Sequence, residues 1–206
     1  PAALGPAARA EAEVRGMSVT EQAASVVMGH IPVTDPAALH AYMQQGLGGF
    51  ILMGSNIPAT EPELHALTSA LTVDESLPPL IAIDQEGGIV SRLPSDAFAA
   101  STTLKSAPVA ETTDAFTARA SLVARAGVNV NFGTVADVTA DSASFIYGRA
   151  LGTDPSSASE RVAAATTAQE GFLASTLKHF PGHGAAEGDS HHAIPTTPMS
   201  KEQWRT

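Results

Sequence analysis

Short apolar segments alternate along the chain with longer segments in which apolar residues recur at helical spacing. Residues 49–53 and 80–83 are almost wholly apolar, which is typical of strands buried on both faces. Further strands are predicted over 128–132 and leading into Lys178 and His179. This alternation predicts an α/β fold built on a parallel sheet of about five strands.

Residues that cap helices mark where the predicted helices begin. Ser18 and Glu21 have the spacing of a capping box, which predicts a helix running towards His30. Further helix starts are predicted at Asp35, Thr60 and Asp154, the first and last of which precede a proline. Residues 1–17 show little apolar periodicity, so we expect a leader or a frayed helix there and one domain over 18–206.

Polar residues cluster directly after the predicted strands. They are Ser55-Asn56, the segment Asp84–Gly88, Asp137, and the loop that begins at Lys178. In a (β/α)8 barrel the carboxyl ends of the strands form the catalytic face, and in a doubly wound sheet they also bind ligands. The pattern therefore predicts a site at this edge under either fold.

The composition of the chain excludes some classes of binding partner and some kinds of chemistry. The formal net charge is −10, and no run of lysine or arginine interrupts the acidic balance, which argues against nucleic acid and anionic membrane surfaces. The absence of cysteine excludes disulfides and thiolate catalysis, and no stretch approaches the roughly 20 apolar residues of a membrane span. The first residue is Pro1 rather than Met, which favours a secreted or cell-surface protein, such as a lipoprotein, over a cytoplasmic one.

Three motifs carry the chemistry. The first is Lys178-His-Phe-Pro-Gly-His-Gly184, followed by Asp189-Ser-His191; the second is Asp84-Gln-Glu-Gly-Gly88 with Arg92; the third is Gly148-Arg149-Ala-Leu-Gly152. They resemble the signatures of glycoside hydrolase family 3, in its bacterial β-N-acetylglucosaminidase (β-N-acetylhexosaminidase) type, and they occur along the chain in the order in which that family has them. The resemblance covers residues 18–205. Ile89, Leu151 and Gly133-Thr134 depart from the usual pattern near the site.

The resemblance implies the N-terminal portion of a TIM (β/α)8 barrel and a retaining exo-β-N-acetylglucosaminidase acting on peptidoglycan-derived fragments. Asp189 and His191 would form the acid/base dyad. The sugar would be held by Asp84, Arg92, Arg149, Lys178 and His179. All of these except Asp84 would donate hydrogen bonds to it. The family's nucleophilic aspartate lies on a later strand, so we expect the 206 residues alone to be inactive and to need the C-terminal part of the barrel. No metal or organic cofactor is required.

The dyad also makes chemical sense from the residues themselves. A glycosidic oxygen must be protonated as its bond breaks, and histidine, with an unperturbed pKa of about 6.5, can supply that proton. Asp189 could accept the other ring N–H of His191 and stabilise the protonated ring. Both water and phosphate stay open as the acceptor of the sugar.

Other interpretations compete with this one. A family 3 β-glucosidase-like exo-glycosidase would generally take its acid from a second domain, and a non-catalytic sugar-binding fragment would need no nucleophile. Asp84 and Lys178 could instead form a structural ion pair across the barrel mouth. Four histidines could supply metal ligands, namely His179, His183, His191 and His192, but their spacing fits no known zinc motif.

Overall fold

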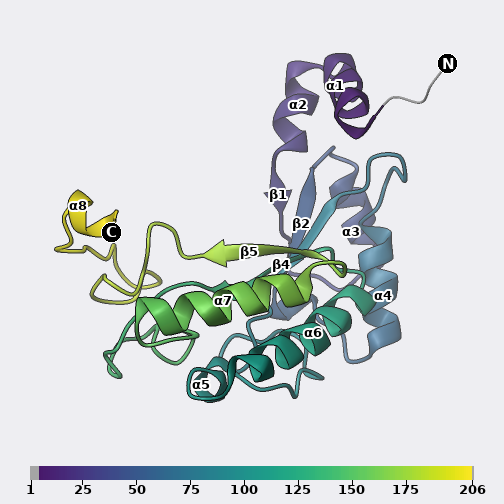
Figure 1. Cartoon of the computed structure of the whole chain (residues 1–206). Coiled ribbons are helices and arrows are strands. Elements are labelled where there is room, and N and C mark those ends of the chain that lie inside the picture. The colour runs from purple at the N-terminus through teal and green to yellow at the C-terminus, as the bar shows by residue number, and fades with distance from the viewer. Residues whose placement is uncertain (1–4, 206) are drawn as a thin grey trace. The chain divides into compact units, whose positions relative to one another are not determined.

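The computed structural model describes residues 5–205 and contains a parallel sheet (Figure 1). Its strands follow chain order, β1-β2-β3-β4-β5. They are β1 (Met28–Gly29), β2 (Gly49–Leu52), β3 (Leu80–Ile83), β4 (Val130–Val135) and β5 (Ala174–Lys178). Every strand pairing that we describe is parallel, as the alternation of strands and helices predicted. Within residues 5–205, no helix is both long and apolar enough to cross a membrane.

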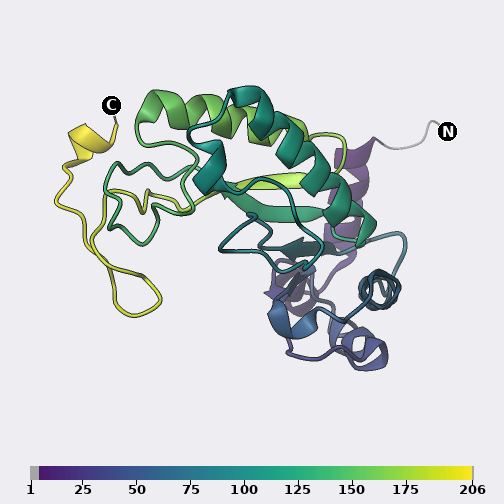
Figure 2. The ribbon, with the colours of Figure 1, turned by 90° about the horizontal axis from the view of Figure 1, so that it is seen from below.

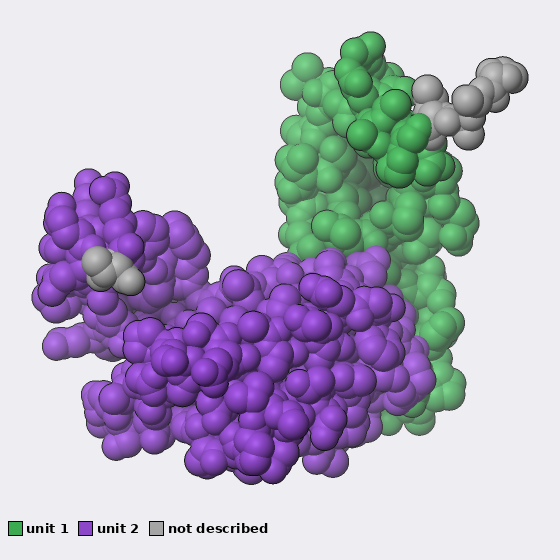
Figure 3. Space-filling model, in the orientation of Figure 1, with its two compact units in different colours: residues 1–81 green, residues 82–206 purple. Residues whose placement is uncertain are grey.

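The chain divides into two compact units, residues 1–81 and 82–206, which Figure 3 colours green and purple. The first unit holds β1, β2, the beginning of β3 and the short 3-10 helix η1 (Gly54–Asn56). Its α-helices are α1 (Pro6–Gly16), α2 (Val19–Ser25), α3 (Pro36–Met43) and α4 (Glu61–Ala70). The first of them, α1, is a regular helix with no buried residue, within the segment expected to be a leader or a frayed helix.

Helix capping follows the sequence pattern closely in this unit. The hydroxyl of Ser18 accepts a hydrogen bond from the backbone N–H of Glu21, whose carboxylate accepts one from the Ser18 N–H in return. Thr60 and Glu63 form the same reciprocal pair at the start of α4. Each box satisfies amides that lack an intrahelical partner, so the predicted helix starts are confirmed.

The prediction that the helix from Ser18 runs towards His30 is wrong. The helix α2 ends at Ser25, and Met28 and Gly29 form the short strand β1 beside Gly49 and Phe50 of β2. A strand of two residues is too short to produce a period-two pattern, so the apolar residues before it were interpreted as a continuation of the helix.

The second unit contains the larger helices. They are α5 (Ser101–Leu104), α6 (Val109–Arg125), α7 (Pro155–Gln169) and α8 (Lys201–Trp204). Helix α7 packs alongside α6 and against β4 and β5 (Figures 1 and 2). Between these elements lies an apolar core that includes Leu104, Phe116, Leu151 and Ala165. Burying side chains of this size stabilises the unit by about 1.5–3 kcal/mol for each large residue.

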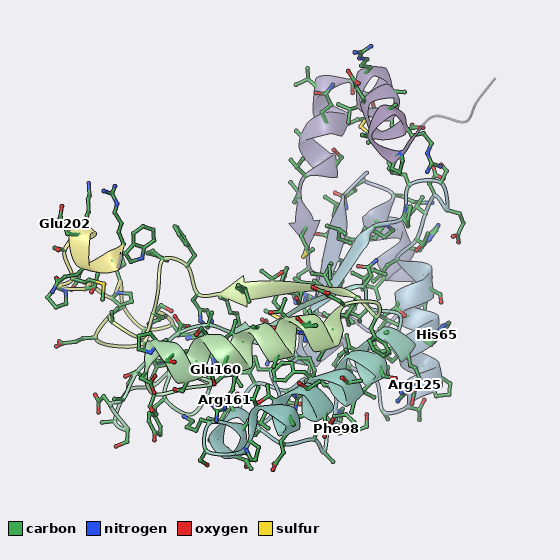
Figure 4. All side chains as sticks on the ribbon, in the orientation of Figure 1. His65, Phe98, Arg125, Glu160, Arg161 and Glu202 are labelled. Carbon is green, nitrogen blue, oxygen red and sulfur yellow. The ribbon has the colours of Figure 1, made fainter. Side chains whose placement is uncertain are left out.

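One arginine of α7 ties that helix to its neighbours. The guanidinium of Arg161, labelled on α7 in Figure 4, donates hydrogen bonds to the carbonyl oxygens of Leu104 at 2.8 Å and Ala107 at 2.7 Å. These carbonyls belong to the end of α5 and the turn after it, where helical hydrogen bonding stops. Arg161 therefore holds the segment between α5 and α6 against α7.

Strand β5 is the last in the sheet order, and its residues are exposed or half-buried. Leu177, in that strand, is 53% exposed. Within residues 5–205 no strand pairs with the outer edge of β5, so that edge and its apolar side chains lack the cover that a further strand gives in a closed barrel.

Candidate functional site

The site lies at the carboxyl ends of three neighbouring strands of the second unit. Asp84 follows β3, Asp137 comes two residues after β4, and Lys178 ends β5 with His179 directly after it. Because these strands are parallel and adjacent, their carboxyl ends meet at one edge of the sheet. This edge is where the sequence predicted a site.

A buried glutamine fixes the segment that follows β3. Gln85 is fully buried, and its side-chain oxygen accepts hydrogen bonds from the backbone N–H groups of Arg92 at 2.8 Å and Leu93 at 3.0 Å. Its own backbone N–H donates to the side-chain oxygen of Asn131 in β4 at 3.0 Å. The neighbouring carboxylates, Asp84 and Glu86, therefore stand on a backbone with little freedom to move.

These two carboxylates are neutralised by cations from other elements. The ammonium group of Lys178 lies 2.8 Å from Oδ1 of Asp84 and 2.6 Å from Oε1 of Glu86. Arg149 donates two hydrogen bonds to Glu86, at 2.9 Å and 2.7 Å, which is the bidentate geometry that guanidinium and carboxylate favour. The guanidinium of Arg92 lies 3.7 Å from the other oxygen of Asp84.

Burial and charge act in opposite directions on Arg149. Desolvation disfavours its positive charge, but the hydrogen bonds and the attraction from Glu86 outweigh it and raise the pKa of Arg149. Glu86 is only 2% exposed, and a carboxylate buried to this degree is costly unless cations lie beside it. The pair therefore presents a permanently charged guanidinium at the site.

A third carboxylate, Asp137, is buried at the end of β4. Its Oδ2 accepts hydrogen bonds from the backbone N–H of His179 at 3.1 Å and from Nδ1 of the same residue at 2.6 Å, and its Oδ1 accepts from the backbone N–H of His183 at 2.5 Å. Burial pushes the pKa of Asp137 up, but these hydrogen bonds outweigh it and hold the pKa below its ordinary value.

The loop after β5 carries the candidate acid/base pair, Asp189 and His191. Oδ1 of Asp189 accepts hydrogen bonds from the backbone N–H of His191 at 2.9 Å and from its ring Nδ1 at 2.6 Å. These bonds, the backbone one first, lower the pKa of Asp189. The ring of His191 is 73% exposed, so Nε2 is free to meet a molecule entering from solvent.

These groups surround one cavity of about 390 Å³, within the range of small-molecule sites. Six of the predicted site residues line it, namely Asp84, Arg92, Arg149, Lys178, His179 and His191. Asp189, the seventh, is paired with His191. The sequence therefore grouped residues up to about a hundred positions apart that do meet in the structure.

Three residues of the site were not predicted as part of it from the sequence, although His183 was among the four histidines considered as metal ligands. Glu86 and His183 line the cavity, and Asp137 holds the segment that contains His179. Glu86 was visible inside the motif Asp84–Gly88, and Asp137 was noted only as a polar residue after a strand. Nothing in the sequence indicated that both would be buried and paired with cationic or N–H groups.

Two details differ from the simplest expectations. The ion pair between Asp84 and Lys178, raised as an alternative to sugar binding, is present, yet both side chains also border the cavity. His179 was expected to donate hydrogen bonds to a sugar, but its Nε2 faces a guanidinium N–H of Arg149 at 3.0 Å. Since guanidinium can only donate, this nitrogen is an acceptor.

The fold and the cavity define a parallel α/β barrel domain with a charged small-molecule site at the carboxyl ends of its strands. The chain belongs to glycosyl hydrolase family 3, because the N-terminal domain of that family matches residues 20–206. The predicted fold, the front portion of a (β/α)8 barrel, is thereby confirmed.

Curated relatives are consistent with this assignment. The chain is 32% identical over 174 residues to the beta-hexosaminidase LpqI of Mycobacterium tuberculosis, covering 82% of this chain and 45% of the relative. It is 35% identical over 166 residues to a beta-hexosaminidase of Pseudomonas aeruginosa, covering 77% of this chain and 49% of the relative. The chain thus spans about half the length of the curated relatives it matches.

Solved structures of the same kind superpose well. A family 3 β-N-acetylglucosaminidase from Paenibacillus sp. str. FPU-7 gives a TM-score of 0.82 at 26% identity, covering 92% of this chain and 38% of that one. The structure of LpqI from M. tuberculosis gives 0.79 at 28% identity, covering 93% of this chain and 57% of that one. NagZ from Neisseria gonorrhoeae gives 0.77 at 25% identity, with coverages of 87% and 56%.

Proposed function

We propose that the protein is a retaining exo-β-N-acetylglucosaminidase that hydrolyses terminal N-acetylglucosamine from peptidoglycan-derived fragments. The observation that carries the proposal is that His191, which is paired with Asp189, lines the same cavity as the charged strand-end groups. Relatives named beta-hexosaminidase and a NagZ structure in complex with N-trifluoroacetyl-D-glucosamine support this substrate class.

His191 acts as the general acid in this proposal. Nδ1 of His191 donates a hydrogen bond to Asp189, and in the protonated ring Nε2 carries a second proton, which passes to the glycosidic oxygen as the bond to the anomeric carbon breaks. The carboxylate of Asp189 stabilises the ring while it is positively charged and keeps it in one orientation. After the leaving group departs, the neutral ring takes a proton from the incoming water.

The strand-end groups hold the sugar in this proposal. Asp84 accepts hydrogen bonds from sugar hydroxyls, and Lys178 and Arg92 beside it donate to hydroxyl oxygens or to the acyl oxygen. Arg149 donates in the same way, and Nε2 of His179 accepts one of its N–H groups and so holds the guanidinium in place. Their mutual ion pairs keep these side chains in place before the sugar arrives, so little ordering is needed on binding.

The nucleophile is proposed to lie outside these 206 residues. Each carboxylate near the cavity in residues 5–205 already has another role: Asp84 and Glu86 pair with cations, Asp137 is buried beneath His179, and Asp189 is bonded to His191. A retaining glycosidase places its nucleophile about 5–5.5 Å from the acid, on the opposite side of the sugar.

A sugar-binding protein without catalysis is the second candidate. The observation that favours it is that, among the described residues, every carboxylate lining the cavity is already paired with a cation. The cavity then has groups that can bind a sugar but no free nucleophile.

Secretion is part of the first proposal. One relative, from Arthroderma benhamiae, is named an uncharacterized secreted glycosyl hydrolase and is 31% identical over 187 residues.

The test is turnover by the intact native polypeptide that carries this sequence. We expect it to release 4-nitrophenol from the N-acetyl-β-glucosaminide far faster than from the β-glucoside, with the β-anomer as first product. Asp84→Ala should abolish turnover, whereas Asp141→Ala, which removes an exposed carboxylate, should not. Sugar binding without turnover would favour the second candidate, and faster cleavage of the glucoside would overturn the specificity. Sugar phosphate formed in phosphate buffer would show phosphorolysis instead of hydrolysis.

A further inference from the structure

The carboxylate of Asp137 holds both ends of one tight turn. Its two oxygens accept the backbone N–H groups of His179 and His183, which begin and end that turn. The backbone N–H of Gly182 donates to the carbonyl oxygen of His179 at 2.8 Å and closes the turn from within. One side chain just after β4 therefore holds both ends of the turn that leads to the Asp189–His191 loop.

The same carboxylate determines which ring nitrogen of His179 carries the proton. The guanidinium of Arg149 lies 3.0 Å from Nε2 of His179 and can only donate, so Nε2 is unprotonated and accepts. The proton of the neutral ring then sits on Nδ1, which donates to Oδ2 of Asp137 at 2.6 Å. A carboxylate partner on Nδ1 is what selects this tautomer.

We infer that Asp137 is a positioning residue: it keeps His179 in the tautomer with the proton on Nδ1, and His179 in turn holds the guanidinium of Arg149 at the cavity. Arg149 is thus held from two sides, by the two oxygens of Glu86 and by the ring of His179. The chain of contacts from Asp137 to Arg149 stands on geometry alone, while its effect on sugar turnover rests on the proposed function.

The turn has a second attachment that should keep it folded when Asp137 is replaced. A side chain at Gly184 would place its Cβ 2.0 Å from the carbonyl oxygen of Val138, so the backbones of the loop and of the segment after β4 are in direct contact. Loss of the carboxylate should therefore release the ring of His179 without unfolding the domain.

The first measurement is the tautomer itself. In protein labelled with ¹⁵N-histidine, two-bond ¹⁵N–¹H correlations at alkaline pH should give His179 the Nδ1–H pattern, assigned by its absence in His179→Gln. Asp137→Ala should convert it largely to the Nε2–H form, and Asp137→Asn, whose amide oxygen still accepts, should retain the Nδ1–H form. Asp141→Ala should change nothing. An Nε2–H tautomer in the wild type, or one unaffected by Asp137→Ala, would overturn the inference.

The second measurement is kcat/KM on an N-acetyl-β-glucosaminide with the same variants of the intact polypeptide. We expect Asp137→Ala to lose on the order of 100-fold and Asp137→Asn clearly less, because displacement of a positioning group by about 1 Å has such an effect. Wild-type turnover that survives in Asp137→Ala within about twofold would refute the positioning role and leave the proposed function intact. The expected tautomers without any turnover would refute the proposed function alone. If Asp137→Ala does not fold, the wild-type tautomer and the Asp137→Asn variant still decide.

Discussion

The guanidinium of Arg119 and the carboxylate of Asp96 form a fully buried ion pair, with Nε of the arginine 2.6 Å from Oδ2 of the aspartate. The same oxygen accepts a hydrogen bond from the side-chain amide of Gln85 at 2.6 Å. Gln85 in turn fixes the backbone between Asp84 and Glu86. Through Gln85 the pair supports the segment that carries Asp84 and Glu86, two carboxylates of the cavity.

Removing the arginine should destabilise the domain strongly. Arg119→Ala leaves the carboxylate of Asp96 buried without its cation, a change that typically costs about 3–5 kcal/mol. The matched control is Arg125→Ala, because Arg125 lies in the same helix and is exposed (Figure 4). Denaturant unfolding should show a much lower midpoint for the first variant than for the second. Equal midpoints would mean that the buried pair contributes little.

A glycine beside this pair should tolerate no side chain. Gly87 has a φ of +86°, and a Cβ added there would lie 2.1 Å from the guanidinium of Arg119. Gly87→Ala should therefore lower the free energy of unfolding by at least about 1 kcal/mol through strain and displacement of the arginine. Gly54→Ala serves as control, since nothing lies within 4 Å of the added Cβ. Comparable thermal midpoints for both variants would contradict the prediction.

Local signals account for what the sequence predicted correctly. Some elements depend only on neighbours within a few residues, so the local sequence is enough to predict them. Examples are the capping boxes at Ser18 and Thr60 and the apolar strand Leu80–Ile83. The strand Met28–Gly29 was missed because its pairing with β2 is tertiary and its two residues carry no period. Local pattern cannot specify such an element.

The site was predictable only in part for the same reason. The motifs identified the residues that border the cavity, because the resemblance and the chemistry of glycoside cleavage both point to those residue types. Most partners of these residues were not visible, since Arg149 and Glu86, for example, are 63 positions apart. The pair of Lys178 with Asp84, 94 positions apart, was raised only as an alternative to sugar binding. Which carboxylate is buried, and which cation neutralises it, is settled by how the strands align.

The stability contribution of Asp137 should depend on pH. Because the folded state lowers the pKa of Asp137, its ionised form stabilises the fold above the unfolded pKa of about 3.9, and this contribution is lost as pH falls through the folded value. Asp137→Asn should thus be less stable than wild type at pH 6, and the difference should shrink below about pH 4. Urea unfolding across this range measures it, and a constant difference would argue against the lowered pKa.

The role of His191 can be separated from simple binding by the leaving group. If His191 supplies the proton, His191→Ala should reduce kcat/KM by about 10²–10⁴-fold on alkyl or sugar aglycones, which need protonation. Dinitrophenyl substrates need little protonation and should lose far less. His65→Ala is the control, because this exposed ring of α4 does not line the cavity (Figure 4). An equal loss on both substrate types would mean that His191 only binds.

The buried carboxylate of Glu86 should prove as important as the groups that face the sugar. Its Oε1 accepts from Arg149 and pairs with Lys178, and its Oε2 accepts a second bond from Arg149. Glu86→Gln keeps the shape but turns one acceptor into a donor, which then faces a cation, and removes the negative charge that balances two positive ones.

We expect this variant to lose at least about 2 kcal/mol of transition-state stabilisation, roughly 30-fold in kcat/KM, because both cations would shift from the positions that bind the sugar. Part of the loss should appear as a higher KM, since sugar binding depends on the same cations. Glu160→Gln, which changes an exposed glutamate of α7, should leave both constants unchanged (Figure 4). If Glu86→Gln has wild-type kinetics, Lys178 and Arg149 are held well enough by Asp84 and His179, and the buried carboxylate serves folding alone.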